Sequence, residues 1–297
     1  MMRKRIPHIL GLLFLFFLSI VIASAYPKLS SINRRKEEYS VLGKKINIEA
    51  KRLQADLSFV IKDLSHPEFH LFFNEDKEFP AASLIKLPIV AVVFKAVGED
   101  KLQLDKKIRI NKKDIENGSG IIKKMKMPVE LTIEDLLSFM IAISDNTATN
   151  KVINLLGYDY INESFKELGL NNTVLKRKMM DFHSRRKGIE NYTSANDIAF
   201  LLEKIYNRSL VDSKASKQML ALLQKQKVKD RIPRALPKNI VIAHKTGLEK
   251  KVVHDAGIVF SSKGDYIICV LTKEVKNDKK AKEFISQLSL STYKLYQ

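Results

Sequence analysis

Segments with strand-like patterns lie near both ends of this 297-residue chain, and a region with helical spacing separates them. Near the start, LSFVIKDL and FHLFFNED are rich in β-branched and aromatic residues, and the turn signal SHPE between them predicts a hairpin over about 57–74. Near the end, NIVIAHKTG, VVHDAGIVFSS and DYIICVLTKE predict further strands. Because such strands must pair to bury their apolar faces, the sequence predicts one antiparallel sheet of about five strands that is assembled from both ends of the chain.

The middle of the chain predicts helices. Runs such as IEDLLSFMIAIS, ATNKVINLLG and ANDIAFLLEKIY carry apolar residues at helical spacing and break at Gly or Asn. A helix with Leu42, Ile46, Ile48 and Leu53 along one side is expected before the first strand, and two more over about 213–226 and 278–296. The fold class is therefore α+β in three layers, α/β/α, with an all-helical lobe inserted into the sheet lobe. The predicted boundaries are 26–34 for a linker, 35–80 and 212–297 for the sheet lobe, and 81–211 for the helical lobe.

The first 25 residues resemble an export signal. Basic residues at 3–5 precede an apolar run over 9–22, and the small residues Ala-Ser-Ala follow at 23–25. The stretch 6–25 is also nearly long enough to cross a bilayer at ~1.5 Å per residue, so an uncleaved membrane anchor is the alternative. Either way, the rest of the chain is expected outside the cytoplasm, as an extracellular or membrane-anchored protein facing outward.

The charge balance narrows the classes of partner. The 52 Lys+Arg residues against 33 Asp+Glu residues give a formal charge of +19, which should attract an anionic cell-wall polymer or a membrane surface. No aromatic-rich RNA motif, zinc-finger spacing or basic-region heptad accompanies the charge, so nucleic acid is not an expected partner. Cys269 is the only cysteine, which excludes an internal disulfide, and its apolar surroundings predict a buried strand position. The protein is expected to be a monomer.

A serine and a lysine three residues apart, Ser83 and Lys86, begin an apolar run. The Ser-x-x-Lys pattern also occurs at 184–187 and 291–294, so the pattern alone does not identify a site. Position distinguishes the three matches, because Ser83 lies where a hairpin ends and a helix begins. There backbone N–H groups favour developing negative charge, and Lys86 lies on the same helical face as Ser83. A deprotonated Lys86 would be able to take the proton of the Ser83 hydroxyl.

Two tripeptides add to this pair: Ser144-Asp145-Asn146 after a helix and Lys245-Thr246-Gly247 at the end of a strand. Alone, the first could be a helix N-cap cluster and the second only a strand end. Together with Ser-x-x-Lys, in this order, they are the signatures of active-site serine penicillin-recognising enzymes. Over roughly 35–297, the sequence resembles the class A β-lactamase family and its relatives.

The resemblance implies a role for each motif residue. Ser83 would attack a carbonyl carbon to form an acyl-enzyme, with Lys86 as proton acceptor or relay. Ser144 would pass a proton to the leaving nitrogen. The substrate would be a β-lactam or a D-Ala-D-Ala-like peptidoglycan stem peptide. No metal and no organic cofactor is expected, and His66 and His70 lack a zinc motif around them.

Further residues would bind the substrate. Asn146 would hydrogen-bond a side-chain amide, and Lys245 and Thr246 would hold a carboxylate. Gly247 would let the strand approach the substrate closely. The backbone N–H groups of Leu248 and of the nucleophile would form the oxyanion hole.

The chain departs from the family pattern at the loop Glu that activates the deacylating water. Aligning the segment 172–194 places Met179 at that position, and the nearest acid is Asp181. Asp181 is a candidate base, or it pairs with Arg177 or Arg185 to hold the loop. Without a well-placed base, deacylation is expected to be slow. Pro88, five residues after Ser83, is expected to loosen the first helical turn.

Other residues border the expected site. Ser119 and Gly120 belong to a flexible-looking loop that would gate access, and His244 and His254 are expected near its rim. The sequence is also compatible with two alternative functions. One is a D,D-peptidase or penicillin-binding protein, and the other is a noncatalytic cell-wall binding protein that adheres through its charge.

Overall fold

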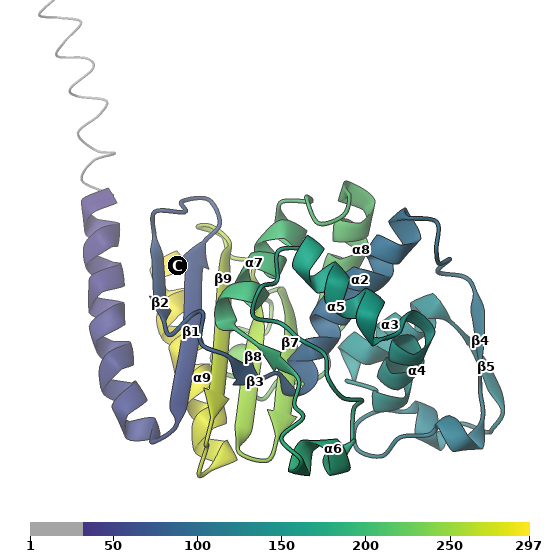
Figure 1. Cartoon of the computed structure of the whole chain (residues 1–297). Coiled ribbons are helices and arrows are strands. Elements are labelled where there is room, and N and C mark those ends of the chain that lie inside the picture. The colour runs from purple at the N-terminus through teal and green to yellow at the C-terminus, as the bar shows by residue number, and fades with distance from the viewer. Residues whose placement is uncertain (1–31) are drawn as a thin grey trace, which may run out of the picture.

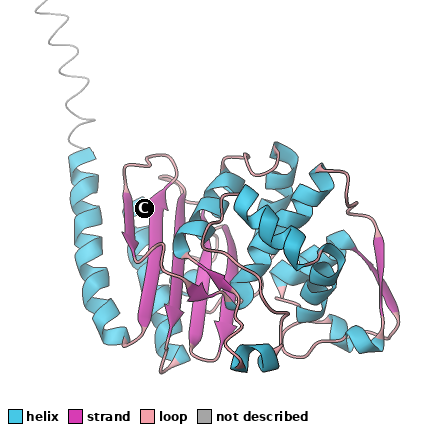
Figure 2. Cartoon of the chain, in the orientation of Figure 1, coloured by secondary structure: helices cyan, strands magenta, loops and turns pink. Residues whose placement is uncertain are grey.

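The computed structural model describes residues 32–297, and three layers make up this part of the protein (Figures 1 and 2). A five-stranded sheet is the middle layer, and helices cover both of its faces. This confirms the predicted α/β/α arrangement. The predicted signal or anchor over 1–25 lies outside the described residues. No helix among the residues described is long and apolar enough to cross a membrane.

The sheet joins the two ends of the chain, as expected. Its strand order is β2-β1-β9-β8-β7, and every neighbouring pair is antiparallel. The strands are β1 (Asp56–Asp63), β2 (His70–Phe73), β7 (Ile242–Glu249), β8 (Val252–Val259) and β9 (Tyr266–Lys273). All eight positions of β8 are buried, because helices pack on both faces of this inner strand. Cys269 is buried in β9, as predicted.

Two helices cover the face of the sheet that lies away from the helical lobe. They are the first helix, residues 32–53, and α9 (Asp278–Tyr293). Leu42 and Ile46 pack with Phe59 of β1 and Ile285 of α9 in one apolar cluster. The prediction that Ile48 belongs to this buried side is wrong, since its side chain is 55% exposed. Successive residues turn by about 100° around a helix, so Ile48 lies about 200° from Ile46.

The opposite face of the sheet packs against the helical lobe, whose apolar residues form a second and larger cluster. The helices of this part are α2 (Lys86–Gly98), α3 (Ile133–Ala142), α4 (Asn146–Leu156), α5 (Tyr158–Glu167), α6 (Phe182–Arg186), α7 (Ala195–Tyr206) and α8 (Ser213–Gln224). α2 runs through the centre of this cluster, with ten of its thirteen residues buried. Its N-terminal end therefore has a fixed position relative to the sheet.

Three details differ from the prediction. Residues 32–34, expected in a linker, already belong to the first helix. The inserted lobe is not all-helical, because β4 (Lys107–Ile110) and β5 (Val129–Thr132) form a two-stranded sheet there. A second small sheet pairs β3 (Phe79–Pro80) with β6 (Tyr192–Thr193). These strands have two to four residues, too few for a period-two pattern to be distinguished from a loop.

Candidate active site

Ser83 lies in a 3₁₀ turn, Ala82–Ile85, between β3 and α2. Ala82 has a φ of +45°, in the left-handed region that residues with side chains rarely adopt. The expected disturbance by Pro88 is not seen, because Lys86 Nζ lies 3.0 Å from Ser83 Oγ. Pro88 is the third residue of α2, and the N–H groups of a first helical turn have no intrahelical acceptor, so none is lost.

The side chain of Lys86 is fully buried and surrounded by oxygen atoms. Its Nζ lies 3.0 Å from Ser83 Oγ, 3.0 Å from Ser144 Oγ, 2.9 Å from the Ser144 carbonyl oxygen and 2.8 Å from Asn146 Oδ1. An ammonium has three N–H donors, so it cannot donate to all four oxygens at once. When Lys86 is neutral, its nitrogen has two N–H donors and one lone pair, and that lone pair can accept a hydrogen bond from one of the serine hydroxyls.

The surroundings favour that neutral form. Burial, and then the positive charge of Lys245, hold the pKa of Lys86 well below its ordinary value, while the Asp145 carboxylate acts in the opposite direction. A buried charge loses the solvation of water, and a like charge nearby raises its cost further. A neutral lysine beside a serine hydroxyl is the arrangement of an activated nucleophile.

Ser144 connects the two buried lysines. Its Oγ lies 3.0 Å from Lys86 Nζ and 3.2 Å from Lys245 Nζ. The residue has a φ of +58°, a strained value for a serine, and strain of this kind gathers at functional sites. The pKa of Lys245 is lowered to about 7, mainly by burial, with Asp255 raising it and Arg231 lowering it further. A proton can therefore pass between these groups near neutral pH.

The amide of Asn146 faces the same centre. Its Oδ1 accepts from Lys86, and its Nδ2 donates to the carbonyl oxygen of Asn117 at 2.9 Å. One N–H of this amide remains for another acceptor. Asp145 points away from the centre, caps α4 through the N–H of Ala148, and accepts from the N–H groups of Ile121 and Ile122.

The predicted gating loop at 116–120 lies against the second motif and is held there. The N–H of Asn146 donates to the carbonyl oxygen of Ser119 at 3.1 Å. A Cβ at Gly120 would lie 2.2 Å from Asp145 Oδ2, and one at Gly118 would lie 2.9 Å from Met180 Sδ. Both glycines have positive φ. They are thus required by close packing, which does not support a hinge that opens and closes.

β7 brings the third motif beside the nucleophile, since this edge strand packs against the 3₁₀ turn of Ser83. Thr246 is buried, whereas the side chain of Leu248 is 48% exposed. A Cβ at Gly247 would lie 3.1 Å from the Cβ of His254 on β8. The glycine is therefore needed for packing within the sheet. The roles of the backbone N–H groups of Leu248 and Ser83 stay predictions.

The loop after α5 holds no carboxylate at Met179. The backbone N–H and carbonyl of Met179 bind the side chain of Asn150 at 2.8 and 3.1 Å, and its own side chain is buried. Asp181 caps the short helix α6, and its two oxygens accept from the N–H and Oγ of Ser184 at 3.0 and 2.7 Å. These hydrogen bonds lower the pKa of Asp181. The carboxylate is ionised but already bonded.

The expected pairing of Asp181 with Arg177 or Arg185 is wrong. Both arginines pair with Glu190 of the same loop, at 2.7 and 3.2 Å, and with Glu249 at the end of β7, each at 3.0 Å. Arg177 is 3% exposed, so its charge needs these partners. The four side chains join the loop to the strand that carries the third motif.

Sequence reasoning missed Arg231, whose side chain is buried close enough to Lys245 and His254 to lower the pKa of both. Its Nη1 lies 3.3 Å from Asp230 Oδ1, yet Nε and Nη1 have no hydrogen bond of good geometry within residues 32–297. No local pattern marks this residue, because its neighbours come from β7 and β8. The buried guanidinium therefore acts on the site through its positive charge beside the third motif.

The expectation that His244 and His254 lie at a rim is also wrong, since both are buried in the sheet. His244 Nδ1 lies 2.9 Å from Asp255 Oδ1. His254 Nδ1 accepts from the N–H of Thr272, so its Nε2 carries the hydrogen that is donated to the carbonyl of Pro80 at 2.8 Å. Burial lowers the pKa of His254 to about 4. This neutral imidazole ties β8 to the segment that leads to Ser83.

The sequence of the chain is similar to those of known beta-lactamases. A family model described as "Beta-lactamase enzyme family" matches residues 42–296. Beta-lactamase VEB-1 of Pseudomonas aeruginosa is 25% identical over 244 residues, which are 76% of this chain and 81% of that protein.

Two solved structures are similar over most of the chain. A beta-lactamase from Sphaerobacter thermophilus is 28% identical with a TM-score of 0.78, covering 86% of this chain and 97% of its own. A leucine-to-glutamate mutant of PBP-A, solved as its acyl-enzyme complex with penicillin G, is 31% identical with a TM-score of 0.78, covering 86% of this chain and 96% of its own. The range that the family model matches, residues 42–296, contains all three motifs.

Proposed function

The chain belongs to the beta-lactamase enzyme family, and on that premise we propose that it is an exported serine hydrolase that forms an acyl-enzyme at Ser83. The amide that it opens is a β-lactam or a D-Ala-D-Ala-like peptide bond. The observation that carries the proposal is the position of Lys86 Nζ, 3.0 Å from both Ser83 Oγ and Ser144 Oγ. That contact joins a nucleophile, a base and a route for its proton.

Acylation follows from this geometry. Ser83 Oγ bonds to the amide carbon while its proton moves to neutral Lys86. The proton then passes through Ser144 to the leaving nitrogen as the C–N bond breaks. The N–H groups of Ser83 and Leu248 bind the oxygen that gains negative charge, each donor typically contributing ~3 to 4 kcal/mol.

The substrate is held by the charges and donors around this centre. Lys245 and Thr246 receive its carboxylate, and the buried positive charge of Arg231 close to Lys245 favours an anion there. The remaining N–H of Asn146 binds the carbonyl of the acyl side chain. Because Lys245 binds an anion best when protonated, acylation is expected to decline as pH rises above about 7.

Deacylation is proposed to be slow. Methionine at 179 cannot activate water, and the Asp181 carboxylate is bonded to Ser184. Loss of a general base slows a step by ~10²- to 10⁴-fold. The penicilloyl form should therefore accumulate, as in a penicillin-binding protein. The similarity to PBP-A, whose mutant was trapped with penicillin G, supports this second candidate, a D,D-peptidase-like penicillin binder.

Burst kinetics with a chromogenic cephalosporin test the proposal. The expected trace is a rapid release of one equivalent followed by slow steady turnover. Rapid linear turnover without a burst would show that an efficient base exists and that deacylation is not the slow step. Absence of both burst and covalent adduct, with salt-dependent adhesion to cell walls, would instead indicate a noncatalytic wall binder.

A further inference from the structure

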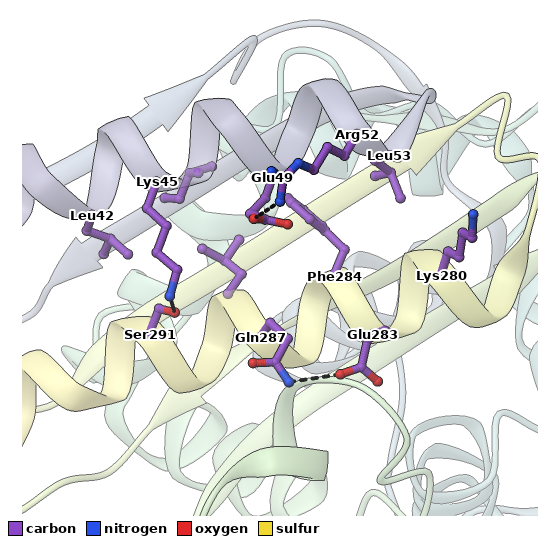
Figure 3. A pocket seen from close by; sticks show the side chains of 12 residues that line it. Leu42, Lys45, Glu49, Arg52, Leu53, Lys280, Glu283, Phe284, Gln287 and Ser291 are labelled. Atoms are coloured by element: carbon purple, nitrogen blue, oxygen red, sulfur yellow. Dashed lines mark hydrogen bonds and ion pairs between the residues drawn. The ribbon is translucent and has the colours of Figure 1, made fainter.

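A groove of about 450 Å³ lies between the first helix (residues 32–53) and α9, on the face of the sheet opposite the helical lobe (Figure 3). Its volume falls within the range of small-molecule sites, roughly 300–1,000 Å³. No residue of the three motifs lines it. The groove is a place to bind a ligand outside the proposed active site.

The floor of the groove is apolar. Leu42, Ile46 and Leu53 contribute from the first helix, and Phe284 and Leu288 from α9. Figure 3 shows Leu42, Leu53 and Phe284 pointing into the space between the two helices. An occupant must therefore offer an apolar body that is long enough to lie along the helices.

The rim is cationic once its own ion pairs are counted. The two acids are neutralised, Glu49 by Arg52 at 3.0 Å and Glu283 by Arg234 at 2.7 Å. Lys45 Nζ donates only to Ser291 Oγ, at 2.9 Å. Within residues 32–297, neither Lys45 nor Lys280 forms an ion pair with a carboxylate. One uncompensated positive charge thus stands at each end of the apolar floor.

The surroundings of the groove indicate that its ligand is a lipid. The apolar run over 9–22 precedes the first helix, and the nine residues 23–31 reach at most about 30 Å when extended. On the outer side of the helix, Ile48 is 55% exposed, and Lys44 and Lys51 flank it. A helix face of apolar and basic residues suits an anionic bilayer surface.

We propose that this groove binds one acyl chain of an anionic membrane lipid, with the lipid headgroup at one of the two rim lysines, Lys45 or Lys280, which lie at opposite ends of the groove. The acyl chain would cover the apolar floor, and the headgroup would supply the negative charge that the rim lacks. Inorganic phosphate matches only the rim, and a neutral lipid matches only the floor. An anionic lipid matches both.

The absence of tryptophan from the chain makes a direct test possible. Phe284→Trp places a single tryptophan in the floor, and Ile48→Trp places one on the outer side of the first helix. Each full-length variant is mixed with vesicles of phosphatidylglycerol or phosphatidylcholine that are brominated in the middle of the acyl chain. Bromine quenches tryptophan only at close range. The proposal expects strong quenching of Phe284→Trp by phosphatidylglycerol and weak quenching by phosphatidylcholine.

Charge reversal separates a built site from general attraction. Lys45→Glu with Lys280→Glu should weaken lipid binding, measured as quenching of Phe284→Trp, about fivefold, since one lysine near an anionic lipid contributes on the order of 1 kcal/mol. The matched pair Lys214→Glu with Lys217→Glu changes two exposed lysines of α8, in the helical lobe on the opposite face of the sheet, and should leave this quenching nearly unchanged. Leu53→Trp repeats the test if Phe284→Trp does not fold.

Three outcomes would overturn the proposal: no quenching in the groove, equal loss in both lysine pairs, or quenching of Ile48→Trp alone. The last would mean that the helix lies on a bilayer while the groove stays without an acyl chain. Fluorescent penicillin labelling of each variant reports separately on the proposed enzyme. If penicillin labelling fails, the proposed enzyme activity is refuted, while the quenching measurement still tests lipid binding in the groove.

Discussion

Replacing Lys245 with Met is expected to stabilise the fold, by an amount that depends on pH. Burial holds the pKa of Lys245 at about 7, against an ordinary value of 10.5. Between these two values the unfolded chain binds more protons than the folded protein, so the free energy of unfolding rises with pH. Below pH 7 both states are protonated, and the whole cost of burying the ammonium is present.

The magnitude follows from the pKa difference of Lys245. At about 1.36 kcal/mol per pKa unit, the cost is on the order of 5 kcal/mol at pH 6 and about 2 kcal/mol at pH 9. The substitution also removes the hydrogen bonds to Ser144 Oγ and the Thr246 carbonyl, at about 1 kcal/mol each, whatever the pH. The gain in stability of Lys245→Met should therefore be about 3 kcal/mol larger at pH 6 than at pH 9.

Urea unfolding at both pH values measures this difference, and comparison with wild type cancels the titration of the groups that Lys245 does not perturb; Lys86, whose pKa Lys245 lowers, is not among them. Lys250→Met is the matched control, because Lys250 is an exposed lysine in the turn after β7. The control should show no such dependence on pH. A gain for Lys245→Met that is equal at pH 6 and pH 9 would refute the description of this lysine as a buried, weakened base.

Three other substitutions give distinct outcomes. Met179→Glu should speed decay of the penicilloyl adduct by ~10²- to 10⁴-fold, as followed by mass spectrometry, while Met179→Gln should leave it slow; equal rates would mean that this position does not face the water. Asp181→Ala should cost about 1 kcal/mol in urea unfolding through loss of the α6 cap, with adduct decay unchanged, and slower decay would instead identify Asp181 as a base. Phe165→Ala should cost about 3 to 5 kcal/mol in urea unfolding, because Phe165 is fully buried under α2, and a cost below 1 kcal/mol would contradict the packing described for the helical lobe.

Much of the fold could be predicted because the deciding signals are local. Alternating or continuous apolar runs mark β1, β8 and β9, and helical spacing marks α3, α4 and α7. The two-residue strand β3 has no such signal, although it delivers Ser83 to its position. The exposure of Ile48 is predictable from helix geometry, because Ile48 lies about 200° around the helix axis from the buried Ile46.

The site could be predicted only in part. Three short motifs identify Ser83, Lys86, Ser144 and Lys245, because each motif is a local pattern of residue types that can be read directly from the sequence. Arg231 was not predictable, since it belongs to the site through neighbours on β7 and β8 that are distant in sequence. The partners of Arg177 were not predictable for the same reason: Glu249 lies 3.0 Å away in space and far along the chain.

The central claim is that the amine of Lys86 makes the hydroxyl of Ser83 a nucleophile. Peptide mapping by mass spectrometry after treatment with penicillin G tests it most directly. The account predicts that the whole mass of the drug appears on the peptide containing Ser83, and that Ser83→Ala abolishes this label. Lys86→Met should slow labelling severely without unfolding the protein. A label on another peptide, or undiminished labelling of Ser83→Ala, would contradict it.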